Sequence, residues 1–151
     1  MIDSIILDST PLGLITGRQD RSAPRECRNW AVKALSSGVT LYVPEIADYE
    51  VRRELLRAGK TAGIDRLNAF ISYATYLPLT TASMRIAAQL WADARNTGVA
   101  TADAAALDGD VIVVAQAISL NSSEQNFVDA TENVRHLSRF VPAKPWQEIN
   151  F

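Results

Sequence analysis

The sequence of 151 residues predicts an α/β fold, in which helices flank a short, mostly parallel sheet of four to five strands in three layers. Short apolar runs alternate with longer helical patterns, which is the arrangement typical of parallel sheets. The length suits a single domain over residues 1–151, and a hydrophobic content of 48% is ordinary for a globular protein. The sequence contains no internal repeat, low-complexity tract or linker-like stretch.

The first third of the chain predicts two strands and three helices. A buried strand "SIILD" covers residues 4–8, and a turn with a short helix follows it in "STPLGLITG". A helix over 24–37 has Pro24 near its start and Gly38 after its end, positions that these two residues favour. The strand "VTLYVP" covers 39–44, and a long helix runs from Pro44 to Gly59.

The remaining elements continue the alternation. We expect helices over about 61–73 and over 81–98, with a short strand at "TYLPL" between them. Near the C-terminus, "NFVDAT" (126–131) and "RFVPA" (139–143) are predicted as short strands.

One apolar segment, "ALDGDVIVVAQAI" (106–118), is ambiguous because its β-branched run favours a strand. Leu107, Val111, Val114 and Ile118 nevertheless repeat at helical spacing, and the length suits a helix better. We therefore predict a buried helix over 108–119, with Asp108 as its N-cap and Asp110 in its first turn. Either these two aspartates only cap the helix, or they also take part in a functional site.

Composition excludes several classes of protein. One cysteine, Cys27, and one histidine, His136, allow neither an internal disulfide nor a Cys/His zinc site. A net charge of −2 gives no overall basic character that would indicate nucleic-acid binding. No apolar run approaches membrane-spanning length, and the start lacks the basic region of a signal peptide. We therefore expect a cytoplasmic protein without membrane contact.

Acidic residues are placed where an α/β site would form. Asp8 follows the first strand directly, and ligands gather at the carboxyl ends of parallel strands. The alternative for Asp8 is a turn residue that caps the next helix. Asp108 and Asp110 precede the apolar helix.

Glu50 is predicted at the edge of a buried face. On a helical wheel Ile46, Tyr49 and Leu56 define an inward stripe that includes Arg53, and Glu50 lies about 40° from Ile46. A carboxylate at the core margin needs a neutralising partner. That partner is either Arg53, as an i,i+3 ion pair, or a cation shared with other acids.

Together these acids favour a metal site. Clustered carboxylates repel one another unless a cation holds them, and oxygen ligands suit Mg²⁺ or Mn²⁺. Such an ion can activate water and stabilise a phosphodiester transition state, a reaction that needs no cysteine or histidine nucleophile.

Four stretches in order, "IILDST", "VPEIADYEVRREL", "LDGDVIVVAQAI" and "ATENVRHLSRF", resemble the PIN-domain ribonucleases, particularly VapC-like toxins of toxin–antitoxin pairs. The resemblance spans essentially the whole chain. It implies a parallel sheet of four or five strands and Mg²⁺- or Mn²⁺-dependent endoribonuclease activity. By the same resemblance Asp8, Glu50 and Asp110 are the catalytic and metal-binding acids, with Asp108 as a secondary ligand.

The sequence departs from this family at one position. Many members carry an aspartate in a Thr-x-Asp segment, and here Asn133 stands there, with Glu132 and Asp129 nearby. Asparagine could bind the ion through its carbonyl but adds no charge. His136 is interpreted as structural rather than catalytic.

Two other functions compete with the nuclease. A PIN fold that binds RNA or a partner with little catalysis is favoured by Asn133 and by the missing basic surplus. A phosphotransfer enzyme with Asp8 as nucleophile would want a second aspartate where Thr10 stands. Dinucleotide binding is not indicated, because the sequence lacks the glycine-rich motif G-x-G-x-x-G.

The resemblance also implies partners: an RNA substrate, a cognate antitoxin that covers the acidic pocket, and a homodimer. Candidate RNA contacts are Arg18, Arg53 and Arg135, with Arg21, Arg52 and Arg139 beside them. For each of these arginines taken singly, solvated surface charge is the favoured alternative.

Overall fold

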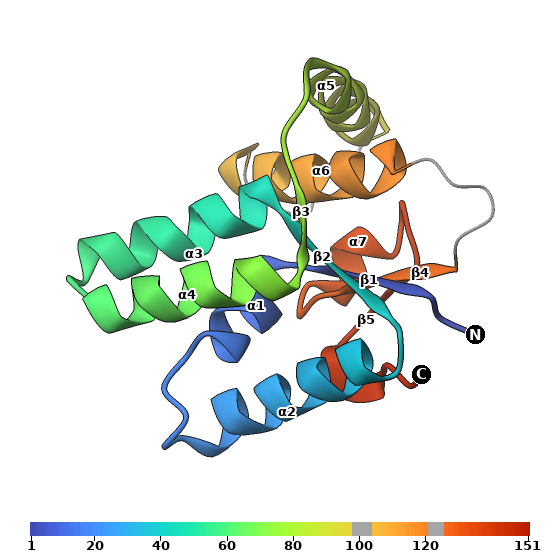
Figure 1. Cartoon of the computed structure of the whole chain (residues 1–151). Coiled ribbons are helices and arrows are strands. Elements are labelled where there is room, and N and C mark those ends of the chain that lie inside the picture. The colour runs from blue at the N-terminus through green and yellow to red at the C-terminus, as the bar shows by residue number, and fades with distance from the viewer. Residues whose placement is uncertain (98–103, 121–125) are drawn as a thin grey trace.

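A sheet of five parallel strands forms the centre of the protein, in the order β3-β2-β1-β4-β5. The computed structural model describes residues 1–97, 104–120 and 126–151, with only the backbone given for 104–106. The strands are β1 (Ser4–Leu7), β2 (Thr40–Pro44), β3 (Thr75–Leu77), β4 (Phe127–Ala130) and β5 (Ala143–Lys144). Helices cover both faces (Figure 1), which confirms the predicted α/β fold.

The helices are α1 (Ser9–Ile15), α2 (Ser22–Ser36), α3 (Glu45–Arg57), α4 (Thr61–Tyr73), α5 (Thr81–Asn96), α6 (Ala104–Ser119) and α7 (Val134–Leu137), followed by the 3-10 turn η1 (Trp146–Glu148). Two of them end where the sequence predicts a stop, because Gly38 and Gly59 adopt the positive φ values +85° and +66°. No helix of the described ranges is long and apolar enough to cross a membrane.

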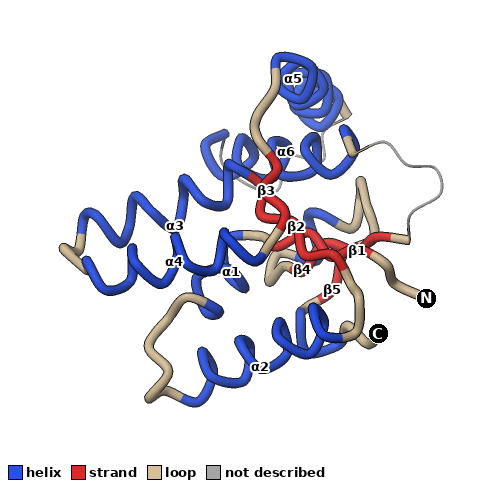
Figure 2. Tube along the Cα trace, in the orientation of Figure 1, coloured by secondary structure: helices blue, strands red, loops and turns tan. Residues whose placement is uncertain are grey.

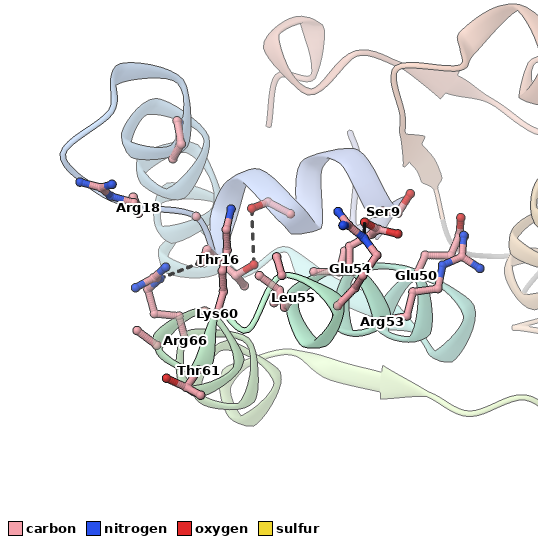
Figure 3. Close-up of a pocket in the computed structure, with 18 of the residues that line it drawn as sticks. Ser9, Thr16, Arg18, Glu50, Arg53, Glu54, Leu55, Lys60, Thr61 and Arg66 are labelled. Atoms are coloured by element: carbon pink, nitrogen blue, oxygen red, sulfur yellow. Dashed lines mark hydrogen bonds and ion pairs between the residues drawn. The ribbon is translucent and has the colours of Figure 1, made fainter.

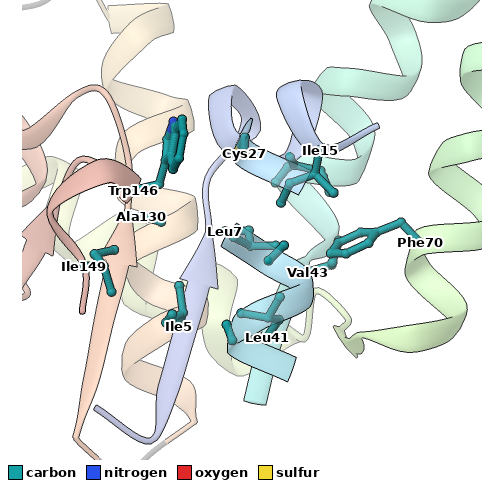
Figure 4. Packing of buried hydrophobic residues seen from close by; sticks show 14 of the residues in the cluster. Ile5, Leu7, Ile15, Cys27, Leu41, Val43, Phe70, Ala130, Trp146 and Ile149 are labelled. Carbon is teal, nitrogen blue, oxygen red and sulfur yellow. The ribbon is translucent and has the colours of Figure 1, made fainter. Parts of the chain in front are cut away.

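Successive residues of β1 point to opposite faces of the sheet and so belong to two separate cores. Ile5 and Leu7 lie in a large cluster with residues of α1, α2 and α4, part of which Figure 4 shows. Ile6 faces the other way, toward Val113 and Val114 of α6. Figure 2 shows this order of layers, with α5 outside α6. Each of these fully buried aliphatic side chains contributes about 1.5–3 kcal/mol.

The strand predicted over 139–143 is wrong for all but its last residue. The backbone N–H groups of Phe140 and Val141 both donate to the carbonyl of Leu137, at 2.9 and 3.1 Å. A chain that turns back on itself in this way cannot pair with β4. Only Ala143 reaches β5, and the short helix α7 precedes this turn.

The predicted inward stripe of α3 is also wrong. Tyr49 and Leu56 are 56% and 64% exposed, and Arg53 is exposed. The buried residues are instead Ala47 and Asp48, because α3 packs between α1, α4 and α6 rather than over a single apolar surface. The buried carboxylate of Asp48 accepts hydrogen bonds from Arg52 Nε at 3.0 Å and from the Tyr76 hydroxyl at 2.7 Å.

Candidate active site

A pocket of about 590 Å³ opens at the carboxyl ends of β1 and β4, and we call it the acid pocket. Three elements each supply one carboxylate to its lining: Asp8 directly after β1, Glu50 from α3 and Asp110 from α6. The complete lining is Asp8, Ser9, Thr10, Glu50, Arg53, Gly109, Asp110, Thr131, Glu132 and Asn133. The structure therefore brings together three of the four acids that the sequence singled out, and leaves out Asp108.

Asp8 is fixed by the start of the next helix and by the neighbouring strand. Its Oδ1 accepts a hydrogen bond from the N–H of Ser9 at 2.7 Å, and it is the N-cap of α1. Its Oδ2 accepts from the hydroxyl of Thr131 at 2.7 Å. Burial raises the pKa of Asp8, although both donors oppose this shift. Asp8 is thus a helix cap and a pocket residue at once.

Glu50 lies half-buried against α6. A Cβ atom placed on Gly109 would lie 3.8 Å from either carboxylate oxygen of Glu50. Burial and the charges of Asp8 and Asp110 raise the pKa of Glu50, and only Arg53 opposes them. Arg53 itself lies over the ring of Tyr49, with 5.1 Å from Cζ to the ring centroid. The structure contains no Glu50–Arg53 ion pair among its described contacts, so the i,i+3 partner is not realised.

The side-chain amide of Asn133 donates hydrogen bonds to the carboxylate of Asp110. The Asn133 Nδ2 atom lies 2.9 Å from both oxygens of Asp110, and the His136 Nδ1 lies 3.4 Å from Oδ2. Burial raises the pKa of Asp110, and so does the charge of Asp8, while Asn133 and His136 lower it. In this structure Asn133 acts as a hydrogen-bond donor to Asp110 rather than as an exposed ligand.

Thr131 is a site residue that the sequence pattern did not single out, and His136, interpreted above as structural, contacts the site through Asp110. Thr131 is buried, donates to Asp8 and accepts a hydrogen bond from the backbone N–H of Asn133 at 2.9 Å. It thereby links Asp8 to the residue that holds Asp110. The Thr-x-Asn spacing of "TEN" is the sequence signal that could have identified it.

The position of α6 is fixed by a buried glutamine. Gln116 accepts from the backbone N–H of Ile46 at 3.2 Å and donates to the carbonyl of Leu77 at 2.7 Å. These bonds tie α6 to the start of α3 and the end of β3. Because Asp110 and Glu50 lie on these two helices, the same bonds set their relative position.

Asp108 does not have the predicted role of N-cap. The helix begins at Ala104, so Asp108 and Asp110 lie inside it, in its second turn. Alanine-rich sequence favours this upstream extension. Asp108 is exposed and absent from the pocket lining, whereas Asp110 is half-buried within it. The prediction of a helix rather than a strand over this segment is confirmed.

Asp129 is a further acid, which lies on β4 and outside the pocket lining. It pairs in register with Ile6 of β1, is fully buried, and neither carboxylate oxygen has a hydrogen-bond partner. Burial raises its pKa well above the usual value, and the charge of Asp8 adds to this. Burial without a donor favours the neutral form of this carboxyl.

The candidate arginines lie in different places. Arg53 lines the acid pocket and also the larger groove beside it. Arg18 lines only that groove and pairs with Asp20 at 2.5 Å. Arg135 is exposed on α7 and lines neither cavity.

The donor set of the acid pocket fits a hard divalent cation in chemical type, because its charged ligands are all oxygen. Burial is the main cause of the raised pKa values of Asp8, Glu50 and Asp110, and a cation bound among these acids would oppose it. Within the described residues, however, no three His, Cys, Asp or Glu side chains form a group ready to hold an ion. Ion binding would therefore require these side chains to shift.

Comparison with solved structures identifies the fold. The chain is similar to a chain of VapBC2 from Rickettsia felis bound to a DNA fragment from their promoter, with 13% identity, a TM-score of 0.71, and 95% of this chain and 98% of that chain covered. It is also similar to a chain of DNA-bound VapBC from Salmonella typhimurium, with 18% identity, a TM-score of 0.66, and 97% and 99% covered. No model of a protein family and no curated protein matches the sequence. The PIN-like, VapC-like resemblance inferred from the motifs is confirmed at the level of fold.

Proposed function

We propose that this protein is a cytoplasmic, metal-dependent endoribonuclease and the toxin of a type II toxin–antitoxin pair. One observation carries the proposal: the carboxyls of Asp8, Glu50 and Asp110 line one pocket at the carboxyl end of the central strand. Carboxylates gathered in one pocket repel one another, and a bound cation would neutralise them and supply a catalytic centre. The VapBC-like fold supports the assignment.

Asp8, Glu50 and Asp110 would hold Mg²⁺ or Mn²⁺. When bound, such an ion lowers the pKa of a water molecule and stabilises charge on a phosphodiester. Thr131 and the N–H of Ser9 hold the Asp8 carboxylate in place. Asn133 orients Asp110, and on ion binding it would give up its hydrogen bond to one Asp110 oxygen, which would then bind the ion.

Cleavage of a mixed RNA pool in Mg²⁺, Mn²⁺ or EDTA tests the proposal. We expect cleavage with either metal, none in EDTA, and none in Asp8→Asn or Asp110→Asn. Mn²⁺ should also raise the melting temperature of the wild type but not of these variants, because only the native state holds the ion. Cleavage that persists in both variants would rule out the acid pocket as the catalytic centre.

A catalytically weak module that binds RNA or a partner is the second candidate. The contact of Asn133 with both oxygens of Asp110 favours it, because it occupies the atoms that an ion would need. RNA binding in EDTA, with no cleavage and no Mn²⁺-dependent change in melting temperature, would establish this function.

The toxin assignment adds an antitoxin that covers the acid pocket, and a homodimer. Both neighbours are VapBC complexes, which supports a protein partner. Bound antitoxin should suppress RNA cleavage and protect the amides of Ser9 and Asn133 from hydrogen exchange. Sedimentation of the isolated chain would establish whether it forms a dimer.

A further inference from the structure

A second cavity adjoins the acid pocket. It is a groove of about 1160 Å³ bordered by α1, the loop after it, and the α3–α4 turn. Figure 3 shows Arg18, Lys60 and Arg66 toward one end and Ser9, Glu50 and Arg53 toward the other. Ser9, Thr10, Glu50 and Arg53 line both cavities, so the groove leads directly into the acid pocket.

The groove concentrates positive charge in a chain whose net charge is −2. Its cationic lining residues are Arg18, Arg21, Arg53, Arg57, Lys60 and Arg66. Its acidic ones are Glu50, which belongs to the acid pocket, and Glu54, which pairs with Arg57 at 2.9 Å. The groove therefore has a surplus of cations for a ligand to neutralise.

Several of these cations are held by the protein itself. Arg18 pairs with Asp20, and the Nε of Arg66 donates to the carbonyl of Thr16 at 2.8 Å. Arg21 and Lys60 are exposed, and neither forms an ion pair with any described residue. These two side chains can contact an anion without breaking an existing bond.

The remaining lining indicates how a ligand would be recognised. No aromatic residue occurs among the described lining, so bases would find no stacking surface there. Small residues, Gly13, Gly17, Ala58 and Gly59 among them, leave the backbone accessible. Such a surface suits a phosphate backbone, which positions a strand without reading its sequence.

We infer that this groove binds the phosphate backbone of single-stranded RNA on one side of the bond to be cleaved. The inference rests on the proposed nuclease function, because the groove ends at the acid pocket where the phosphodiester would react. An acidic protein segment would also match the charge. The shared lining residues favour the substrate, since a strand bound in the groove passes the three carboxylates.

Equilibrium binding of a fluorescein-labelled 12-nucleotide RNA in EDTA tests this inference. The variant is Arg21→Glu/Lys60→Glu, and the control is Arg85→Glu/Lys144→Glu, two exposed residues outside both cavities with the same change in charge. We expect the groove variant to bind about tenfold more weakly at 50 mM salt, with a log–log salt slope smaller by about 1.4, for two lost phosphates. The control should retain the wild-type slope.

Equal RNA affinity and slope in the groove variant and the control would overturn the inference. So would binding of a 15-residue oligoglutamate, lost in the groove variant, by a protein that does not bind RNA; the groove would then belong to an acidic protein partner. Failure of the nuclease proposal is measured separately. If the wild type binds RNA through the groove but never cleaves it in Mn²⁺, the groove assignment stands and the nuclease does not.

Discussion

Replacing Asp129 with valine should stabilise the protein. The Asp129 side chain is fully buried in β4, opposite Ile6, and its two oxygens lack hydrogen-bond partners. Valine has a similar branched shape and suits a strand. The substitution removes a buried polar group and breaks no hydrogen bond of the described structure.

The expected gain has two parts. Removing an unsatisfied buried polar group is worth about 1–3 kcal/mol, which for a chain of this length is a rise of roughly 2–12 °C in Tm. The second part depends on pH. The pKa of Asp129 is raised in the folded state, so its protonated form contributes stability below the unfolded pKa that is lost as pH rises toward the folded pKa. The advantage of valine should therefore grow between about pH 4 and pH 7, by up to about 1.4 kcal/mol per pH unit.

Urea unfolding in EDTA at several pH values measures both parts. Asp129→Asn separates them, because it keeps an unsatisfied polar group but does not titrate; it should recover only the pH-dependent part. A valine variant that is less stable than the wild type at pH 7 would refute the reasoning, since the carboxyl would then have a stabilising partner in solution. If the extra stability of the valine variant does not change with pH, the raised pKa of Asp129 in the folded state is refuted.

Four further substitutions test other parts of the structure. Thr131→Val should cost about 1–3 kcal/mol in urea unfolding, because Asp8 loses a buried donor, while Thr131→Ser should not. Asn133→Asp should lower Tm in EDTA, because a second carboxylate replaces the donor to Asp110, and Mn²⁺ should restore it; no recovery would argue against an ion at this position. Glu50→Gln should raise Tm at pH 7 but not at pH 4, because the raised pKa of Glu50 makes its ionisation unfavourable in the folded state. Gly59→Ala should cost about 1–2 kcal/mol at its φ of +66°, whereas Gly13→Ala, in ordinary contact with Val51, should cost less.

Local signals predicted most of the fold. The helix expected over about 61–73 matches α4, which spans Thr61–Tyr73. Gly38 and Gly59 stop their helices for a reason visible in the sequence, the rarity of positive φ in other residues. The strand at 139–143 failed because its apolar residues pack against α6 from a turn, and composition alone does not distinguish that from a strand.

Two features of the site depend on tertiary contacts that the sequence pattern does not contain. The buried face of α3 could not be read from one helical wheel, because several elements cover different sides of it. The direction of the Asn133 amide and the role of Thr131 follow from the approach of β4 to β1. Asp8 and Asp110 could be expected at the site because each adjoins an apolar element, whereas Glu50 was assigned to it from a helical wheel whose inward stripe is wrong and from the family resemblance. Their metal-binding and catalytic roles remain predictions.

The central place of β1 in the sheet has a consequence for the order of assembly during synthesis. The backbone N–H of Asp8 donates a hydrogen bond to the carbonyl of Ala130. The carboxylate of Asp8 accepts a hydrogen bond from the hydroxyl of Thr131, 123 residues later in the chain. At about 5–20 residues per second, translation needs roughly 6–25 s to add those residues. Once residue 110 has been added, the nascent chain carries all three acids, but until β4 follows it lacks the strand that fixes the first of them. The acid pocket can therefore form only after β4 and the residues that follow it have been synthesised, and a chain truncated before β4 would contain the three acids without the strand that positions Asp8.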